Sequence, residues 1–271
     1  MKIAQINTVC GNGSVGRITV DIYHALKKEG HEGKIYYGRR TAPESVKTEK
    51  IGTNLDMGFH VLSTFFTGTH GFNSKGQTKR LIESLKEYDP DLIHMHNIHG
   101  FYLEVEMLFD YLKQCGKPVV WTLHDCWSFT GHCAYFDFVE CDKWKTSCEK
   151  CPQYRNSYPY ALFKDGSKVN FARKKDAFQG VKGLTIVTPS KWLGELVKES
   201  YLKEYPVKVI PNGIDLEKFV PQESKKRDKH LILGVANVWD RRKGLDYLKE
   251  LSQMLEHEKY EVAVVGVNKK Q

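Results

Sequence analysis

The feature that most constrains this sequence is a regular alternation of short apolar runs with longer stretches of helical periodicity. The apolar runs are nearly continuous, which is typical of parallel strands buried on both faces of a sheet. The stretches between them have apolar residues three or four positions apart, which predicts amphipathic helices. This order predicts an α/β fold with a Rossmann-like, doubly wound parallel sheet, whose ligands bind beyond the carboxyl ends of the strands.

The patterns place each expected element within a few residues. Strands are expected at Lys2–Asn7, Lys34–Tyr37, Leu92–Met95, Val119–Leu123, Leu184–Thr188, Val207–Ile210, Leu231–Val235 and Glu261–Val265. Helices are expected at Arg17–Glu29, Lys79–Tyr88, Leu103–Cys115, Phe171–Phe178, Lys191–Tyr201 and Leu245–His257.

A change of composition after Ile210 predicts a domain boundary. The sequence P-N-G-I-D at 211–215 and the charged run at 225–229 are typical of a linker. We therefore expect an N-terminal Rossmann-like domain at 1–210, a linker at 211–229, and the beginning of a second Rossmann-like domain at 230–271. Because the last part is too short to bury both faces of a sheet, we expect the chain to be a truncated form.

Composition and charge exclude several classes of protein. The 271 residues are 41% hydrophobic and 27% charged, which is typical of a globular domain. No apolar run reaches the roughly 20 residues needed to cross a bilayer, and the start MKIAQINTV lacks the features of a secretory signal. We expect a cytoplasmic protein, whose net charge of +8 favours anionic partners. No nucleic-acid-binding motif appears, so nucleic acid is not expected as a partner.

A glycine-rich turn joins the first expected strand to the first expected helix. Gly11-Asn12-Gly13-Ser14-Val15-Gly16 fits G-x-G-x-x-G, in which glycines let the backbone approach a diphosphate at a helix amino end. A dinucleotide site also requires an acidic residue after the second strand, where Arg39 and Arg40 stand instead. An arginine there suits a 2′-phosphate, so an NADP-dependent oxidoreductase is one alternative, and a tight turn without a ligand is another.

Histidines gather where two consecutive expected strands end. His94, His96 and His99 follow Asp91-Leu92-Ile93, and His124-Asp125 follows Trp121-Thr122-Leu123. The period of a strand puts His94 and His96 on one face. Since strand ends line the ligand cleft of a doubly wound sheet, we favour functional roles for these groups over purely structural ones. A metal triad of the first three histidines is disfavoured, because no carboxylate stands in a matching position.

A cysteine-rich loop follows His124. Cys126 is followed by Cys133, Cys141, Cys148 and Cys151 with the spacing C-x7-C-x6-C-x2-C. Four thiolates suit tetrahedral zinc, which would order a loop without a core of its own. The alternatives are free thiols in an aromatic-rich loop, or disulfides, which are disfavoured in a reducing compartment.

The segment Asn54–Phe72 is rich in large apolar residues and has few charges. As a helix it would be apolar over most of its circumference, as in a buried helix or an interfacial one. The nearby Lys75, Lys79 and Arg80 would favour an anionic surface. We favour packing in the core or a lid over membrane contact.

Taken in order, these motifs resemble the N-terminal half of the GT-B-fold glycosyltransferases of family 4. The stretch H-D-C-W-S-F-T-G-H-C-A-Y with the later C-x2-C-P is most similar to the bacterial capsular and exopolysaccharide branch. The remaining matches are Gly11–Arg17, Asp91–His96, Thr122–Asp125, Thr188–Trp192, Pro211–Asp215 with Phe219, and Arg242–Gly244.

The resemblance implies a retaining glycosyltransferase that needs no catalytic metal. It would transfer a sugar from a UDP- or GDP-sugar to a glycan or lipid-linked acceptor during surface polysaccharide biosynthesis. The N-terminal domain would hold the acceptor and the C-terminal domain the nucleotide-sugar. Peripheral contact with the anionic inner face of the plasma membrane is a further hypothesis that follows from such an acceptor.

The resemblance also implies roles for individual residues. His124 and Asp125 would be catalytic, whereas His94, His96 and Asn97 would line the acceptor side of the cleft. Gly13, Ser14, Gly16, Arg242 and Lys243 would bind the donor and its phosphates.

Two departures from the family pattern modify these expectations. Asn237 replaces the arginine that usually precedes the Lys243 position by about six residues, so Arg241 or Arg242 would have to substitute. The paired glutamates that clasp the donor sugar would lie beyond residue 271, so we expect no sugar transfer by this chain alone. Two rival hypotheses are an NADP-dependent oxidoreductase, which lacks a Ser/Tyr/Lys hydride-transfer group here, and a zinc-stabilised binding module without catalysis.

Overall fold

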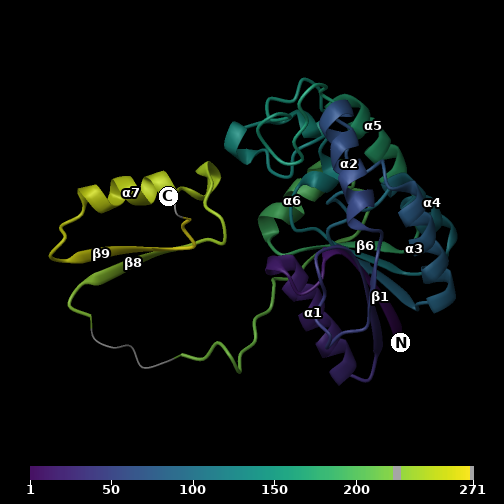
Figure 1. Cartoon of the computed structure of the whole chain (residues 1–271), viewed down its shortest axis with the longest axis horizontal. Coiled ribbons are helices and arrows are strands. Elements are labelled where there is room, and N and C mark those ends of the chain that lie inside the picture. The colour runs from purple at the N-terminus through teal and green to yellow at the C-terminus, as the bar shows by residue number, and fades with distance from the viewer. Residues whose placement is uncertain (222–226, 269–271) are drawn as a thin grey trace. The chain divides into compact units, whose positions relative to one another are not determined.

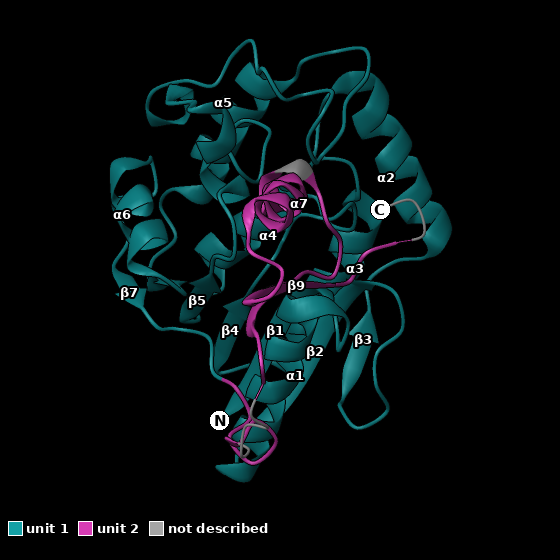
Figure 2. Cartoon of the chain, turned by 90° about the vertical axis from the view of Figure 1, so that its left-hand side faces the viewer, with its two compact units in different colours: residues 1–213 teal, residues 214–271 magenta. Residues whose placement is uncertain are grey.

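The computed structural model describes residues 1–221 and 227–268. The chain forms two compact units, Met1–Gly213 and Ile214–Gln271, which Figure 2 shows in different colours. The boundary between the units lies within the linker predicted at 211–229, of which residues 222–226 fall outside the described part. Among the described residues, no helix is long and apolar enough to cross a membrane.

Unit 1 is built on a seven-stranded, fully parallel sheet with the order β3-β2-β1-β4-β5-β6-β7. The direction of chain progression reverses between β1 and β4, which makes this the switch point of a doubly wound sheet. The predicted α/β fold is therefore confirmed. The strands are β1 (Lys2–Val9), β2 (Glu32–Arg39), β3 (Thr48–Lys50), β4 (Leu92–Met95), β5 (Val119–Thr122), β6 (Leu184–Thr188) and β7 (Val207–Val209).

Helices cover both faces of this sheet. The helix α1 lies against β1 and β2 on one side, and α3 and α4 lie on the other (Figure 1). The helices are α1 (Gly13–Lys28), α2 (Asn54–Thr67), α3 (Lys75–Tyr88), α4 (Val105–Gln114), α5 (Ser167–Phe178) and α6 (Lys191–Glu199). The predicted helices and strands of unit 1 are confirmed with small shifts at their ends. The edge strand β3 was not predicted, because its residues Thr-Glu-Lys carry no apolar pattern.

An aromatic cluster in the core of unit 1 supports the ends of the central strands. Trp121 of β5 packs edge-to-face against Phe178 of α5, with ring centroids 5.2 Å apart, and Phe109 of α4 contacts both rings. The Trp121 indole also donates a hydrogen bond of 3.1 Å to the backbone carbonyl of His96. This hydrogen bond ties the loop after β4 to the aromatic core of unit 1.

The segment that follows β3 forms the helix α2. Its first turn is stabilised by a capping box between Thr53 and Asp56. His60 and Thr64 are buried, and the His60 Nδ1 lies 2.7 Å from the Ser74 hydroxyl. The opposite side of α2 is exposed to solvent. Of the two kinds of packing that the sequence favoured, burial in the core is therefore wrong for that side of the helix, and packing as a lid stays a prediction.

The described residues of unit 2 form a two-stranded parallel sheet, one α-helix and the short 3-10 helix Arg241–Lys243. The strands are β8 (His230–Val235) and β9 (Tyr260–Val265), and α7 (Leu245–Met254) connects them. These elements confirm the strand–helix–strand pattern predicted for this part of the chain. Leu233 and Val235 of β8 and Val265 of β9 are each more than half exposed within the described residues.

The chain crosses itself closely where α2 ends and α5 is about to begin. A Cβ added to Gly166 would lie 2.3 Å from the backbone oxygen of Gly68. The Asn170 side-chain amide donates to the same oxygen at 2.8 Å. Two backbone segments far apart in sequence therefore meet at a distance that only glycine allows.

We predict that Gly166→Ala lowers the free energy of unfolding by about 1–3 kcal/mol, since backbone atoms must move to admit the methyl group. Gly76→Ala is the matched control, because no heavy atom lies within 4 Å of its added Cβ and it stands within the helix α3. Alanine there should leave stability unchanged or raise it slightly. Urea denaturation of both variants measures the difference, and equal stabilities would contradict the close crossing.

Candidate active site

The glycine-rich turn lies at the carboxyl end of β1, beside the switch point of the sheet. Gly11 has φ +71° and donates its backbone N–H to the Gly16 carbonyl at 2.8 Å. A Cβ on Gly16 would stand 3.2 Å from the Gly11 nitrogen. The turn is therefore closed by its own backbone, and both glycines are needed for its close packing.

The amino end of α1 presents unpaired backbone donors. Asn12 occupies the N-cap position, but its side chain makes no capping hydrogen bond within the described structure. It donates instead to the carbonyls of Cys10 and Thr41, at 3.0 and 2.7 Å. Gly13 and Ser14 begin the helix and are exposed, and no acidic residue stands in the first turn. An anion such as a phosphate can accept hydrogen bonds at this positive helix end.

Three histidines form a connected group at the ends of β4 and β5. The rings of His94 and His96 lie 4.2 Å apart, which confirms that they share one face of the strand. The His96 Nδ1 lies 3.2 Å from the His124 Nε2, and the two rings stack with an interplanar angle of 17°. The His94 Nε2 lies 2.9 Å from the Thr122 hydroxyl.

These histidines are uncharged at neutral pH. Burial, with a smaller contribution from His124, lowers the pKa of His94 to about 4. Burial also lowers the pKa of His124 to about 4, although Asp125 opposes the shift. Burial lowers the pKa of His96 well below its ordinary value. The group can therefore accept and donate hydrogen bonds, but it does not supply positive charge.

The three rings differ in exposure to solvent. His96 is buried, and His94 is partly buried beside it. His124 is likewise partly buried, and its Nε2 lies near His96, while its Nδ1 makes no hydrogen bond within the described residues.

Asp125 points to a different set of partners from its neighbour His124. Its Oδ2 lies 2.8 Å from the His99 Nε2, and its Oδ1 accepts from the Trp127 backbone N–H at 2.9 Å. The other ring nitrogen of His99 lies 3.0 Å from the Tyr158 hydroxyl. Burial alone would raise the pKa of Asp125, but His99 and the Trp127 N–H together hold that pKa below its ordinary value. A buried carboxylate is thereby kept ionised.

No feature of the sequence predicted that Tyr158 belongs to this network. Tyr158 is 59 positions from His99 and lies in the loop after β5, where no spacing or periodicity links it to the strand ends. The Tyr158 hydroxyl also lies 3.4 Å from the Nε2 of the buried His70. His99 and Asp125 were both among the predicted strand-end residues, but their contact with each other was not predicted.

Asn97 is fixed between β1 and β4. Its backbone N–H donates to the Asn7 side-chain oxygen at 3.2 Å, and its carbonyl accepts from the Thr8 hydroxyl at 2.9 Å. Its side chain is half-buried at the edge where the strands end. The backbone of the loop after β4 is therefore held to β1, beside the glycine-rich turn.

The four cysteines predicted to bind zinc line one small pocket together with Phe136 and Trp144. They are Cys133, Cys141, Cys148 and Cys151. All four are free thiols, and a hydrogen bond joins Cys133 to Cys151.

The structure does not support the zinc prediction. No group of three or more His, Cys, Asp or Glu residues in the described part of the chain is arranged to hold a metal ion. The expectation rested on a loop without its own core, whereas Phe129, Phe136 and Trp144 are buried there, with ring centroids 4.9–6.4 Å apart. This aromatic packing orders the loop.

Arg242 and Lys243 belong to unit 2, in the turn between β8 and α7. This turn leaves the carboxyl end of β8, the side of a parallel sheet on which ligands bind. Both residues are exposed, and the Lys243 backbone N–H donates to the Asp240 carboxylate at 3.0 Å. The predicted phosphate-binding cations are thus on the side of unit 2 that suits that role.

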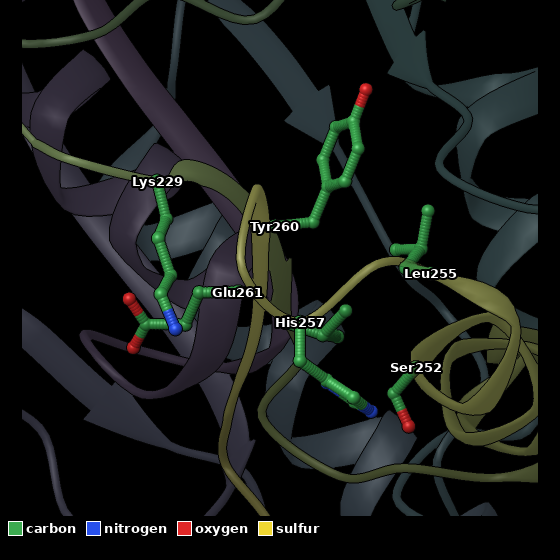
Figure 3. Close-up of a pocket in the computed structure, with 7 residues that line it drawn as sticks. Lys229, Ser252, Leu255, His257, Tyr260 and Glu261 are labelled. Carbon is green, nitrogen blue, oxygen red and sulfur yellow. The ribbon is translucent and has the colours of Figure 1, made fainter.

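Unit 2 also contains a cavity of about 390 Å³, which lies at the amino ends of β8 and β9 (Figure 3). Its lining includes Lys229 and Tyr260, which stand at the amino ends of β8 and β9. Because ligands of this fold bind beyond the carboxyl ends, the cavity is not part of the candidate site.

The buried histidines predict a loss of stability in mild acid. Burial lowers the pKa of His60, His94, His124 and His132 to about 4. Between pH 6.5 and 4 the unfolded chain therefore binds more protons than the folded one, so stability is full above pH 6.5 and falls as the pH decreases. Each histidine should remove up to about 2 kcal/mol between pH 7 and pH 5.

Urea denaturation at several pH values measures this dependence. His132→Gln should make the slope shallower, because it removes one buried ring whose pKa burial lowers to about 4. A free energy of unfolding that is constant from pH 7 to pH 5 would contradict the burial of these groups.

Comparison with family models identifies one family. The family model "Glycosyltransferase Family 4" matches residues 13–218. The putative colanic acid biosynthesis glycosyl transferase WcaC of Escherichia coli K12 is 26% identical over 235 residues, which are 80% of this chain and 55% of that protein. The chain thus spans about half the length of this curated relative.

Solved structures show the same fold at low sequence identity. Sucrose-phosphate synthase from Thermosynechococcus elongatus has a TM-score of 0.60 and 13% identity, over 100% of this chain and 63% of that one. WaaG, a glycosyltransferase involved in lipopolysaccharide biosynthesis, has a TM-score of 0.53 and 16% identity, over 97% of this chain and 62% of that one. These likenesses support the predicted GT-B fold. With most of its length matched by the family model, the chain belongs to glycosyltransferase family 4.

Proposed function

We propose that this chain contributes to a retaining glycosyltransferase that moves a sugar from a UDP- or GDP-sugar to a glycan or lipid-linked acceptor. The observation that carries the proposal is the meeting of two features at adjacent strand ends of unit 1. A helix amino end suited to phosphate follows β1, and a neutral histidine group follows β4 and β5. The family membership and the name of the Escherichia coli relative support a role in surface polysaccharide biosynthesis.

Each unit would offer groups that suit the donor phosphates. In unit 1, Gly13, Ser14 and Gly16 would offer backbone N–H groups at the start of α1. In unit 2, Arg242 and Lys243 would supply positive charge. As the bond between sugar and phosphate breaks, negative charge develops on the leaving diphosphate, and fixed donors and cations stabilise it. No catalytic metal is part of this proposal.

The two proposed catalytic residues would act in different ways. The free Nδ1 of His124 is the nitrogen available to a sugar hydroxyl, and its neutral state lets it act as either donor or acceptor. Asp125 would be a positioning residue, because its carboxylate is engaged by His99 and the Trp127 N–H. It would fix the start of the loop that follows β5.

The acceptor side of unit 1 would be formed by His94, His96 and Asn97, and the contact between His96 and His124 would help to fix the His124 ring. Unit 1 would therefore be the acceptor-side domain and unit 2 the beginning of the nucleotide-sugar domain. The proposal also includes a cytoplasmic protein in peripheral contact with the anionic inner membrane. A lipid-linked acceptor would be reached from that surface.

Nucleotide binding tests the proposal against its main rival. A longer form of the protein, with the length of its curated relative, is heated with UDP, GDP or NADP. A rise in melting temperature with UDP or GDP alone is expected, and a screen of nucleotide-sugars then identifies the donor. A rise with NADP alone would favour the oxidoreductase and overturn the proposal.

We predict that His124→Ala in the longer, active form lowers the turnover rate at least about a hundredfold, the lower range for a positioned catalytic side chain. His24→Ala is the matched control, because His24 is exposed on α1 and distant from the strand ends. The turnover rate is measured from the release of the nucleoside diphosphate, UDP or GDP. Near-normal turnover in the His124 variant would assign that ring a structural role.

A further inference from the structure

The exposed side of α2 carries a continuous apolar patch. It consists of Leu55, Phe59, Leu62 and Phe66 of the helix, together with Phe163. The spacing of the four helical residues places them on one side of α2. Their exposed fractions are 78%, 73%, 54% and 51%, and that of Phe163 is 61%. Exposed apolar surface of this extent marks an interaction site more often than it occurs by chance.

The apolar patch is held rigidly rather than left loose. The rings of Phe66 and Phe163 stack with centroids 5.0 Å apart and an interplanar angle of 1°. The backbone N–H of Leu162 donates to the Phe65 carbonyl at 2.9 Å, which ties the Phe163 segment to the helix. On the inner side, His60 and Thr64 are buried. The apolar side chains therefore project from a fixed surface.

Basic side chains stand next to both ends of the patch. At the start of α2, Arg80 of α3 lies 3.9 Å from Asp56, so the two helices approach each other there. Lys75 and Lys79 are exposed on the same part of α3. At the far end, Lys164 follows Phe163 and is exposed. The patch itself contains no charged side chain, and the net charge of the chain is +8.

We propose that the apolar patch docks on an anionic lipid bilayer, with its phenylalanines at the boundary between headgroups and acyl chains. An apolar helix face flanked by lysine and arginine is the combination that binds such a surface. A second copy of the chain fits less well, because a stable dimer buries at least about 1,200 Å² and would bring equal basic flanks together. The inference gives a surface to the membrane contact in the proposed function and rests on it in that respect.

Co-sedimentation with vesicles tests the proposal on the 271-residue chain. The chain should bind vesicles of phosphatidylglycerol and phosphatidylcholine, and bind pure phosphatidylcholine much more weakly. The triple variant Phe59→Gln, Leu62→Gln, Phe66→Gln should bind the anionic vesicles at least about tenfold more weakly. Glutamine is chosen because it preserves helix propensity. The double variant Lys75→Gln, Lys79→Gln should also reduce binding, and more so at low salt.

Trp192→Gln is the matched control. Trp192 is a half-exposed aromatic residue on α6, which lies across unit 1 from α2 (Figure 2). This variant should bind vesicles as the wild type does. Circular dichroism confirms that the compared variants are folded.

Three results would overturn the inference. They are an absence of wild-type binding to anionic vesicles, unchanged binding by the triple variant, and a wild-type dimer in size-exclusion chromatography that the triple variant converts to a monomer. The last result would assign the patch to self-association. Because nucleotide binding is measured without vesicles, a failure here is distinguishable from a failure of the proposed glycosyltransferase function.

Discussion

The architecture of unit 1 depends on one constraint, which is that a parallel sheet must bury both of its faces. The connections between parallel strands run through helices, and the right-handed sense of these crossovers sends successive helices to one face or the other. When chain progression reverses between β1 and β4, the two connections leave the sheet in opposite directions. The edge between those strands is left open for a ligand. The glycine-rich turn and the histidine group both occupy this edge because strand order places them there.

Burial determines the chemistry of that edge. The core packs directly beneath it through Trp121, whose indole holds the His96 carbonyl. The same close packing removes water from the imidazoles and keeps them neutral, whereas Asp125 stays ionised through its own hydrogen bonds. The His124 imidazole and the Asp125 carboxylate are adjacent in sequence, but they take part in two different hydrogen-bond networks. The local balance between desolvation and hydrogen bonding separates their roles.

Aromatic residues act in two opposite ways outside the sheet. In the loop after β5, Phe129, Phe136 and Trp144 pack on one another and give the loop an internal core. On α2, comparable side chains are turned outward, because the inner side of that helix is occupied by the hydrogen-bonded His60 and Thr64. Apolar composition is similar in the two segments. Which side chains are buried is decided by the polar groups that the fold draws inward.

The sequence by itself determined the order and type of the elements, since apolar runs and helical periodicity are local properties of the chain. It also predicted the strand-end positions of His94, His96 and His124, because the period of a strand is fixed. Only the tertiary structure decided that Tyr158 joins His99 and Asp125, that the cysteines do not form a metal site, and that α2 exposes an apolar face. Each of these depends on contacts between residues distant in sequence, and such contacts are set by how whole elements pack rather than by any local pattern.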